Sequence, residues 1–408
     1  MRISTSMLNE NAVNAILQDQ AELAQTQNQL ATGKSINSPS DNPVGMVQVL
    51  QLDATNSQYR QYVTNGQSAN TNLTLEENAL TSSTATLQSI RDLVVQANSG
   101  TNNSSDLQDI AAQISALENQ LQGTANSQNA QGEYLFAGFS SGTQPFVRGA
   151  TGSMTYVGDP GTNTVPIAGG TSVQTGDAGS SVFMNLPAGN GTFATSAGAG
   201  NTGTGVIDTG TVTNATSWNA AVNATPTGAP FTIGFTDATH YTVTDANGNS
   251  VGSGTYDATS GGAIAFDGVQ VGISGAPAAG DSFTVSPAGK QSVFDTLDNL
   301  VGALNNAGST SAARAQLGSK LNNALQGIDT ALQQVSTVTS NVGARLNLIS
   351  SVNSSLQTAS TTVQSQISNL SDLDYAKATA AYSQQYIALQ AAEQSFADIN
   401  QLSLFKYL

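Results

Sequence analysis

Aliphatic residues recur at every seventh position along a segment near the C-terminus that is otherwise polar. No charged residue occurs between Arg345 and Asp372, and Ser and Thr, which are mediocre helix formers, fill much of this gap. A seven-residue repeat keeps one edge of a helix against a partner, with a left-handed supercoil. We therefore predict a single helix over 321–370, about 75 Å long at 1.5 Å per residue, rather than a disordered linker. Its seam consists of Leu321, Ile328, Val335, Val342, Ile349, Leu356, Val363 and Leu370.

The N-terminal half repeats this spacing. A further helix is indicated there by a capping-box pattern, Ser105-Asp106-Leu107-Gln108. We expect 46–130 and 290–370 to pack together as the core of a helical bundle within one chain. The N-terminal seam consists of Leu52, Tyr59, Gly66, Leu73, Leu80, Leu87 and Val94, with Gly66 as the one weak member.

The two ends of the chain carry shorter seams, and no other obvious element covers them. Gln20 and Gln27 fall in the N-terminal seam, and polar seam residues lower stability while favouring particular registers. Helices of this kind are marginal alone and gain order by packing among neighbours. Polymerisation through 1–33 and 375–408 is therefore our hypothesis, and a bundle satisfied within the monomer is the alternative. The predicted contact residues are Ile16, Leu23 and Leu30 with Tyr382, Leu389 and Phe396.

Period-two alternation replaces the heptad spacing in the middle of the chain. Apolar residues alternate with small or polar ones from Phe231 to Phe235, and Asn247-Gly248 and Asp267-Gly268 are strong hairpin-turn signals. We predict an antiparallel sheet or sandwich here. Residues 188–215, rich in Gly, Ala, Thr and Asn, fit a long mobile loop as readily as strands.

Composition divides the chain at similar places. Residues 132–289 hold 30 of the 40 glycines and eight of the ten prolines, and Arg148 is their only Lys or Arg. We predict a mainly α fold with a β insert: a long, coiled-coil-like helical bundle formed by both flanks around a β-rich middle domain. The predicted divisions are 1–45 with 372–408 as a terminal-helix coiled coil, 46–145 with 288–371 as a bundle with a small hairpin, and 146–287 as the β domain.

Charge and composition exclude several classes of function. The net charge is −16, and only 11 residues are Lys or Arg, without a cluster that could neutralise nucleic-acid phosphates or an anionic membrane. No apolar run approaches the roughly 20 residues that span a bilayer, so we expect no membrane insertion. The first residues lack the apolar core of a secretory signal peptide. The chain has no cysteine, which excludes disulfides and thiolate metal sites.

The titratable residues do not suggest catalysis. The single histidine, His240, lies in a run typical of a strand edge, and no plausible nucleophile or metal-ligand cluster surrounds it in the sequence. The Asp residues of the middle region are scattered, without the close spacing of calcium loops. We therefore predict no enzyme, no metal and no cofactor.

Four motifs resemble flagellins and flagellar hook-associated proteins. They are LATGKSINSPSDNPVGM at 30–46, NAQGEYLFAGFSSGTQPF at 129–146, GDSFTVSP at 280–287 and LSLFKYL at 402–408. In the first, Gly33 can end one helix and Asn42-Pro43 can start the next. Lys406 replaces the Asn that is usual in this family, a small departure.

The resemblance implies a structural part of the bacterial flagellum. It implies a junction that connects hook-associated protein 1 (FlgK) to the flagellin filament and helps to nucleate that filament. The implied partners are identical copies in a ring, FlgK, flagellin and a cytoplasmic type III export chaperone such as FlgN. The implied location is extracellular, at the hook–filament junction, after export through the flagellar type III apparatus.

The resemblance also assigns residues. The terminal seam residues would form an inner, axial helix pair, and the β domain would face outward. Tyr134, Leu135 and Phe136 would form a strand of a small hairpin packed on the bundle, or plain hydrophobic core. Axial contacts at the end of the chain would come from Leu402, Leu404, Phe405 and Leu408.

Two other functions stay open. The chain could be flagellin itself, although the GEYLFAGF run and the LSLFKYL end favour a junction protein. The β domain could also bind glycans, but its only tryptophan is Trp218, and sugar platforms usually need more exposed rings.

Overall fold

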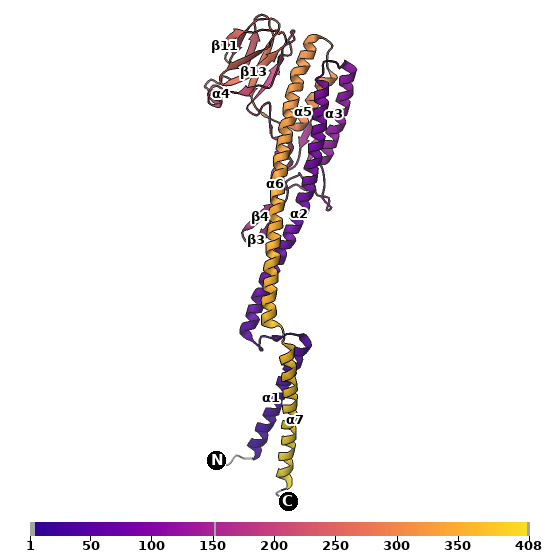
Figure 1. Cartoon of the computed structure of the whole chain (residues 1–408), viewed down its shortest axis with the longest axis vertical. Coiled ribbons are helices and arrows are strands. Elements are labelled where there is room, and N and C mark those ends of the chain that lie inside the picture. Colours follow the sequence, from indigo (N-terminus) through magenta and orange to yellow (C-terminus); the bar gives the residue numbers. More distant parts are fainter. Residues whose placement is uncertain (1–4, 151, 406–408) are drawn as a thin grey trace. The chain divides into compact units, whose positions relative to one another are not determined.

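The computed structural model describes residues 5–150 and 152–405, with the backbone only at 5, 6, 8 and 399–405. The chain forms two compact units, Met1–Asn65 with Ser351–Leu408, and Gly66–Ser350, which we call unit 1 and unit 2. Helical flanks precede and follow an antiparallel β middle in sequence, and the sheets of that middle lie beside α6, which confirms the predicted fold class (Figure 1). The helices are α1 (Thr5–Thr32), α2 (Pro43–Ala97), α3 (Ser104–Ala125), α4 (Ala215–Val222), α5 (Val293–Asn305), α6 (Ser311–Ser371) and α7 (Tyr375–Phe405), with a short π-helix η1 (Ser180–Met184).

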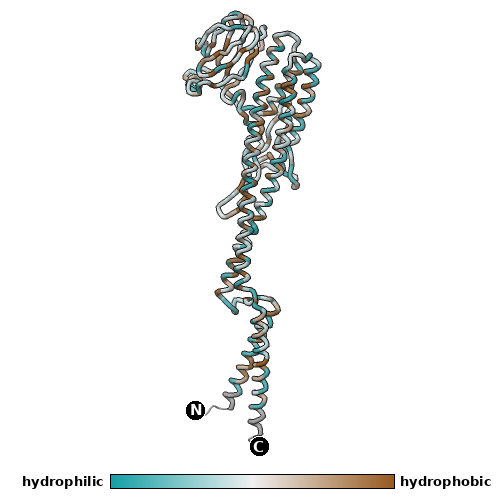
Figure 2. Tube along the Cα trace, in the orientation of Figure 1, coloured by the Kyte–Doolittle hydropathy of each residue, from teal (hydrophilic) through white to brown (hydrophobic). Residues whose placement is uncertain are grey.

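The long helices arise from the heptad repeat. Helix α6 has 61 residues and contains the whole predicted segment 321–370, and α2 has 55 residues. Hydrophobic and hydrophilic positions alternate along both helices, as Figure 2 shows. In unit 2 the seam residues are almost fully buried: Leu73, Leu80, Leu87 and Val94 on α2, and Leu321, Ile328, Val335, Val342 and Ile349 on α6. In unit 1, Leu356 and Val363 are buried and Leu370 is half-buried.

Helix α3 begins at a different residue from the one predicted. Its N-cap is Asn103, whose side-chain oxygen accepts from the N–H groups of Ser105 and Asp106 at 2.8 and 3.0 Å. The Asp106 carboxylate in turn accepts from the Asn103 N–H at 2.9 Å. The capping box is therefore Asn103 with Asp106, and the prediction of Ser105 with Gln108 is wrong. An Asn three positions before an acidic residue makes the same capping box two residues earlier in the chain.

The sheets follow the predicted alternation. A five-stranded sheet has the order β11-β10-β9-β14-β6, and a second has the order β12-β13-β7, with β8 also pairing with β13. The Asn247-Gly248 turn joins β10 to β11, and the Asp267-Gly268 turn joins β12 to β13, as predicted. The strands of these sheets are β6 (Phe193–Ala197), β7 (Val206–Ile207), β8 (Thr211–Val212), β9 (Phe231–Phe235), β10 (His240–Thr244), β11 (Ser250–Thr255), β12 (Gly262–Phe266), β13 (Val269–Ser274) and β14 (Ser282–Pro287).

One apolar core joins the two sheets. Ile233 and Phe283 of the larger sheet share it with Val271 of the smaller one. Trp218 on α4 is 2% exposed, and its ring centroid lies 5.6 Å from those of Phe193 and Phe231. The tryptophan is therefore a core residue, so it offers no platform for a sugar. Part of the 188–215 segment forms strands β6 to β8, because its apolar residues complete this core.

The remaining strands form small two-stranded sheets. They are β1 (Phe146–Arg148) with β2 (Met154–Tyr156), β3 (Thr164–Ala168) with β4 (Thr171–Gln174), and β5 (Leu186–Pro187) with β15 (Lys290–Gln291). Tyr134–Phe136 do not form the hairpin strand that the resemblance implied. Only an isolated bridge links Tyr134 to Gln128, because turns at Gly132 and Gly138, both with positive φ, direct neighbouring N–H groups to different carbonyls. Phe136 is fully buried, which is its plain core role.

Candidate assembly site at the paired termini

Helices α1 and α7 lie side by side in unit 1 (Figure 1). The predicted residues on them differ in burial. Leu389 is 9% exposed, whereas Ile16, Leu23, Leu30, Tyr382 and Phe396 are half-buried. Leu402, Leu404 and Phe405 lie in α7 beyond the described side chains, and Leu408 lies outside the described residues. The pair therefore covers its apolar stripe only in part.

Polar side chains take part in the contact between these helices. The Thr26 hydroxyl donates to Gln385 Oε1 at 2.8 Å, and Gln27 Nε2 donates to the Tyr382 hydroxyl at 3.2 Å. The rings of Tyr382 and Tyr386 stack at 6.3 Å with an interplanar angle of 15°. Sequence reasoning singled out Gln27 but missed Thr26, the buried member, whose signal was its position beside the apolar seam. Such hydrogen bonds favour one register of the pair.

Large apolar side chains on both helices face solvent. Leu17 on α1 is 57% exposed, and Ile387 on α7 is 64% exposed. At the start of α2, Val44, Val47 and Leu50 are all more than half exposed. An accumulation of this kind within one unit is typical of a surface that binds another protein. The charges are sparse here as well, because α7 has none between Lys377 and Glu393.

A short clasp, residues 33–42 with 371–374, connects the helices of unit 1. Gly33 ends α1 with φ of 71°, a left-handed conformation that favours glycine, as predicted. The Ser35 N–H then donates to the Ser371 carbonyl at 2.7 Å, and the Leu373 N–H donates to the Gly33 carbonyl at 2.9 Å. These bonds join two segments that are more than 300 residues apart in sequence.

Asp41 accepts hydrogen bonds that hold residues 33–42, the N-terminal segment of the clasp. Its Oδ2 accepts from the N–H groups of Asn37 and Ser38 at 3.0 and 2.8 Å, and its Oδ1 accepts from Gln25 Nε2 at 3.1 Å. The Ser38 and Asn37 N–H groups lower the pKa of the Asp41 carboxyl, because they stabilise its charged form. Asn42 then caps α2 by accepting from the Gly45 N–H at 2.9 Å, so α2 begins at Pro43, as predicted.

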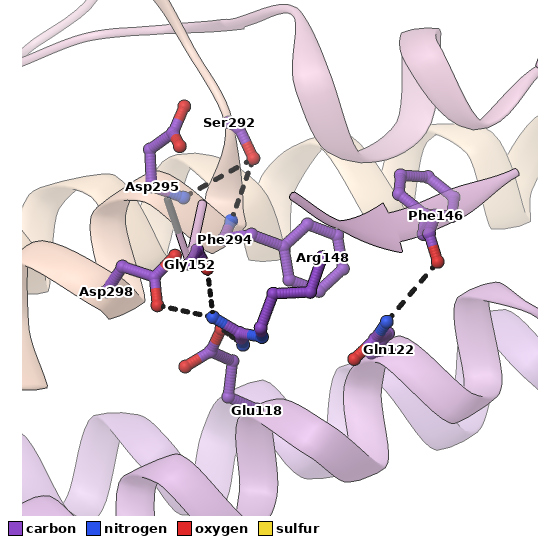
Figure 3. Close-up of polar contacts among 9 residues, drawn as sticks. All are labelled: Glu118, Gln122, Phe146, Arg148, Gly152, Ser292, Phe294, Asp295 and Asp298. Atoms are coloured by element: carbon purple, nitrogen blue, oxygen red, sulfur yellow. Dashed lines mark hydrogen bonds and ion pairs between the residues drawn. The ribbon is translucent and has the colours of Figure 1, made fainter. Parts of the chain in front are cut away.

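Unit 2 contains an ion cluster that the sequence did not predict (Figure 3). Arg148 Nη2 donates to Glu118 Oε1 on α3 at 2.5 Å, and Nη1 donates to Asp298 Oδ1 on α5 at 3.0 Å. Glu118 is 1% exposed, and its burial raises its pKa although Arg148 opposes the shift. The signal in the sequence was Arg148 itself, the only Lys or Arg in 132–289. The cluster ties α3, β1 and α5 together.

A second ion cluster joins α2 to α6. The Asp177 carboxylate accepts two bonds from the Arg345 guanidinium, at 2.9 and 3.0 Å. The Asp177 N–H donates to Glu76 Oε1 at 3.0 Å, and Glu76 is 1% exposed. Burial raises the pKa of Glu76 to about 8, and the nearby Asp177 charge adds to the shift. Both clusters join separate elements of unit 2 through buried carboxyl groups.

The described residues offer little for catalysis or for membrane insertion. Over 5–150 and 152–405, no group of three or more His, Asp or Glu residues is placed to hold a metal ion. His240 is exposed on β10, and its Nδ1 lies 3.0 Å from Asp237. Within the same described ranges, every helix is too short or too polar to cross a membrane.

Comparison with known families places matches along most of the chain. Residues 3–141 match the bacterial flagellin N-terminal helical region, and residues 325–408 match the bacterial flagellin C-terminal helical region. Residues 197–287 match the D2-like domain of flagellar hook-associated protein 1. Both flanks and most of the β middle therefore have relatives in flagellar proteins.

Individual relatives match over nearly their full length. Flagellar hook-associated protein 3 of Salmonella typhimurium is 24% identical over 412 residues, which cover 100% of this chain and 99% of the relative. The crystal structure of FlgL from Xanthomonas campestris is 32% identical and covers 75% of this chain and 99% of its own, with a TM-score of 0.68. The crystal structure of flagellar hook-associated protein 3 from Legionella pneumophila is 28% identical. It covers 79% of this chain and 98% of its own, with a TM-score of 0.72.

Proposed function

This chain belongs to the family of flagellar hook-associated protein 3 (FlgL), the hook–filament junction proteins of the bacterial flagellum, and we propose that it makes the junction through the apolar surface of unit 1. The observation that carries the proposal is the exposure of Leu17, Ile387 and the apolar start of α2 on the helices whose seams are only half covered. Burial of this surface would contribute roughly 25 cal/mol per Å² before the entropy of ordering is subtracted.

Identical copies are the first proposed partners on this surface. Helices α1 and α7 combine a stripe of half-buried apolar residues with exposed residues on their other sides, as helices inside a tubular stack require. Helix α7 also carries no charge between Lys377 and Glu393, and a buried unpaired charge would be costly. We propose a ring of copies in which the terminal helices form the inner wall and 146–287 the outward-facing domain.

The flagellar neighbours follow from the family. The junction role places FlgK on the hook side and flagellin on the filament side. We propose that the terminal seam contacts both and that a ring of copies offers flagellin a template for nucleation. The full-length relatives are hook-associated proteins rather than flagellins, so the alternative of a filament subunit is not favoured.

Export is the remaining part of the proposal. We propose that the chain leaves the cell through the flagellar type III apparatus and that a chaperone such as FlgN holds the C-terminal helical region beforehand. Exposed apolar residues on α7, such as Ile387, would promote aggregation before assembly unless another protein bound them, which supports a chaperone that acts before export.

The experiment replaces exposed apolar residues of unit 1 by Glu in cells that lack the wild-type chain. Leu17→Glu and Ile387→Glu should leave the monomer folded and secreted but should prevent a stable junction, so that motility is lost and unpolymerised flagellin appears in the medium. Val251→Glu, at a residue that is 37% exposed on β11, is the matched control and should swim normally. Normal motility with both unit 1 variants would refute the assembly role of this surface.

A further inference from the structure

The buried carboxyl of Glu76 lies outside the surface proposed to make the junction. Its surroundings contain more carboxyls than cations. Glu76 on α2 and Asp177 supply two carboxyls, and Arg345 on α6 supplies one guanidinium. Both oxygens of Asp177 already accept from Arg345, at 2.9 and 3.0 Å. If both carboxyls were ionised, one negative charge would stay uncompensated in a place where Glu76 is 1% exposed. Such a charge is costly to bury.

The two oxygens of Glu76 have different environments. Oε1 accepts from the Asp177 N–H at 3.0 Å, whereas Oε2 is buried and has no hydrogen-bond partner. A Cβ placed on Gly176 would lie 3.8 Å from Oε2 and 3.5 Å from the Leu135 carbonyl. Gly176 also lines a polar cavity of about 60 Å³, to which Glu133 and Tyr134 contribute the other titratable groups besides Asp177. A cavity of this size can admit water to an ionised carboxylate.

Glu76 sits where one segment is fastened to the helices. Asp177 belongs to 175–179, the connection between β4 and η1, and the Gly179 N–H donates to the Phe136 carbonyl at 2.8 Å. Phe136 packs edge-on against Phe183 of η1, with ring centroids 5.5 Å apart. The attachment of 175–179 therefore bears on the packing of the aromatic core beside the helices.

We propose that Glu76 is a proton-operated latch: with its proton bound it holds 175–179 against α2 and α6, and loss of the proton above neutral pH releases this segment. The neutral acid leaves the Asp177–Arg345 pair balanced in charge. The ionised form repels Asp177, which lies on the same segment, and draws water from the adjacent cavity. The raised pKa of Glu76, about 8, agrees with this geometry. The pKa of Glu76 in the folded chain lies above its ordinary value of 4.5. The stabilisation is therefore fully present below pH 4.5 and is lost as the pH rises through about 8.

The test is hydrogen exchange of the full chain, with rates corrected for intrinsic exchange. Between about pH 6 and about pH 9.5, protection of 175–179 should fall at least about tenfold in the wild type and change less than about twofold in Glu76→Gln. Glu118→Gln, which removes a buried carboxyl in the other cluster, is the control and should retain the wild-type pH response of 175–179. Protection that is independent of pH in the wild type, or a loss in Glu76→Gln equal to that of the wild type, would overturn the latch.

Infrared difference spectra give a second readout that does not depend on the stability of one variant. The wild type should show the C=O stretch of a protonated acid near pH 6 that disappears as pH rises, and Glu76→Gln should lack this band. Asp177→Asn removes the repelling charge and frees Arg345, so the band should disappear at lower pH than in the wild type. A wild-type band that is missing at pH 6, or a midpoint unmoved in Asp177→Asn, would count against the proposal.

Discussion

The hydroxyl of Thr26 on α1 donates to Gln385 on α7 across 2.8 Å, and Thr26 is 7% exposed. The two residues are 359 positions apart in sequence. The same hydroxyl also lies 3.0 Å from the Glu22 carbonyl within α1, so its single proton is shared between the two acceptors. The contact is thus a partly buried polar bond between the two helices proposed to build the junction, and it favours one register over others.

Removing this hydroxyl should loosen the terminal pair. Thr26→Val keeps the shape but leaves Gln385 Oε1 without its donor, and we expect a loss of about 1 kcal/mol in the pairing of α1 with α7. Hydrogen exchange of α1 amides measures the loss. Thr64→Val is the control, because the Thr64 hydroxyl is exposed and donates only to the Arg60 carbonyl of its own helix. Equal effects of the two changes would show that the Thr26–Gln385 bond does not hold the pair.

The Arg148 cluster should be a strong contributor to the stability of unit 2. Arg148→Met leaves the buried Glu118 without its cation, and breaking a pair of this kind costs about 3 kcal/mol. Urea unfolding measures the change. Arg314→Met removes an exposed guanidinium that donates to the Gly100 carbonyl, and it should change stability little. Arg148→Met combined with Glu118→Gln should recover part of the lost free energy of unfolding. If the double variant lost as much as the two single variants added together, an ion pair between Arg148 and Glu118 would be contradicted.

Gly138 should tolerate no side chain. Its φ is 66°, and a Cβ there would lie 1.9 Å from the Asp159 carbonyl oxygen. Gly138→Ala must move that backbone, so we expect a loss of more than about 3 kcal/mol in thermal unfolding. Gly132 has a φ of 80° but nothing within 4 Å, so Gly132→Ala should cost only about 1 kcal/mol from backbone strain. Similar losses in the two variants would mean that the Asp159 carbonyl can move aside.

Asp237 should titrate far below an ordinary carboxyl. The Thr239 N–H and hydroxyl donate to it, and His240 lies 3.0 Å away; these groups lower its pKa to about 2. A carboxyl whose pKa is lowered by folding stabilises the folded state above pH 3.8, and this stabilisation is lost as the pH falls through about 2. Carboxyl-carbon NMR should give a midpoint near 2. Asp237→Asn should make the decline of stability in acid shallower, and an unchanged decline would show that these bonds do not persist in solution.

Several features were predictable from the sequence because their physical causes are local. A seam repeated every seven residues identifies a long helix without any knowledge of its partner, as for Ile328 to Val363 on α6. Asn247-Gly248 and Asp267-Gly268 specify tight turns through the conformations of two residues. Gly33 and Pro43 likewise end and begin helices by their own backbone preferences.

Local patterns misled where a competing local interaction was available. Ser105 and Gln108 fit the capping pattern, but Asn103 and Asp106 fit it too and satisfy the first N–H groups two residues earlier. The strand that the family resemblance implied for Tyr134–Phe136 is also absent, because the turns at Gly132 and Gly138 prevent a ladder.

The sequence by itself determined the periodicities of the flanks and the middle, the turns between strands and the scarcity of charge, because each depends on neighbours along the chain. Only the tertiary structure decided which polar groups meet. Glu76 on α2, Arg345 on α6 and Asp177 in the connection between β4 and η1 lie far apart in sequence, and the bonds between them span 101 and 168 residues. Burial then sets their chemistry, because the charge balance and the access of water arise only when these elements pack together.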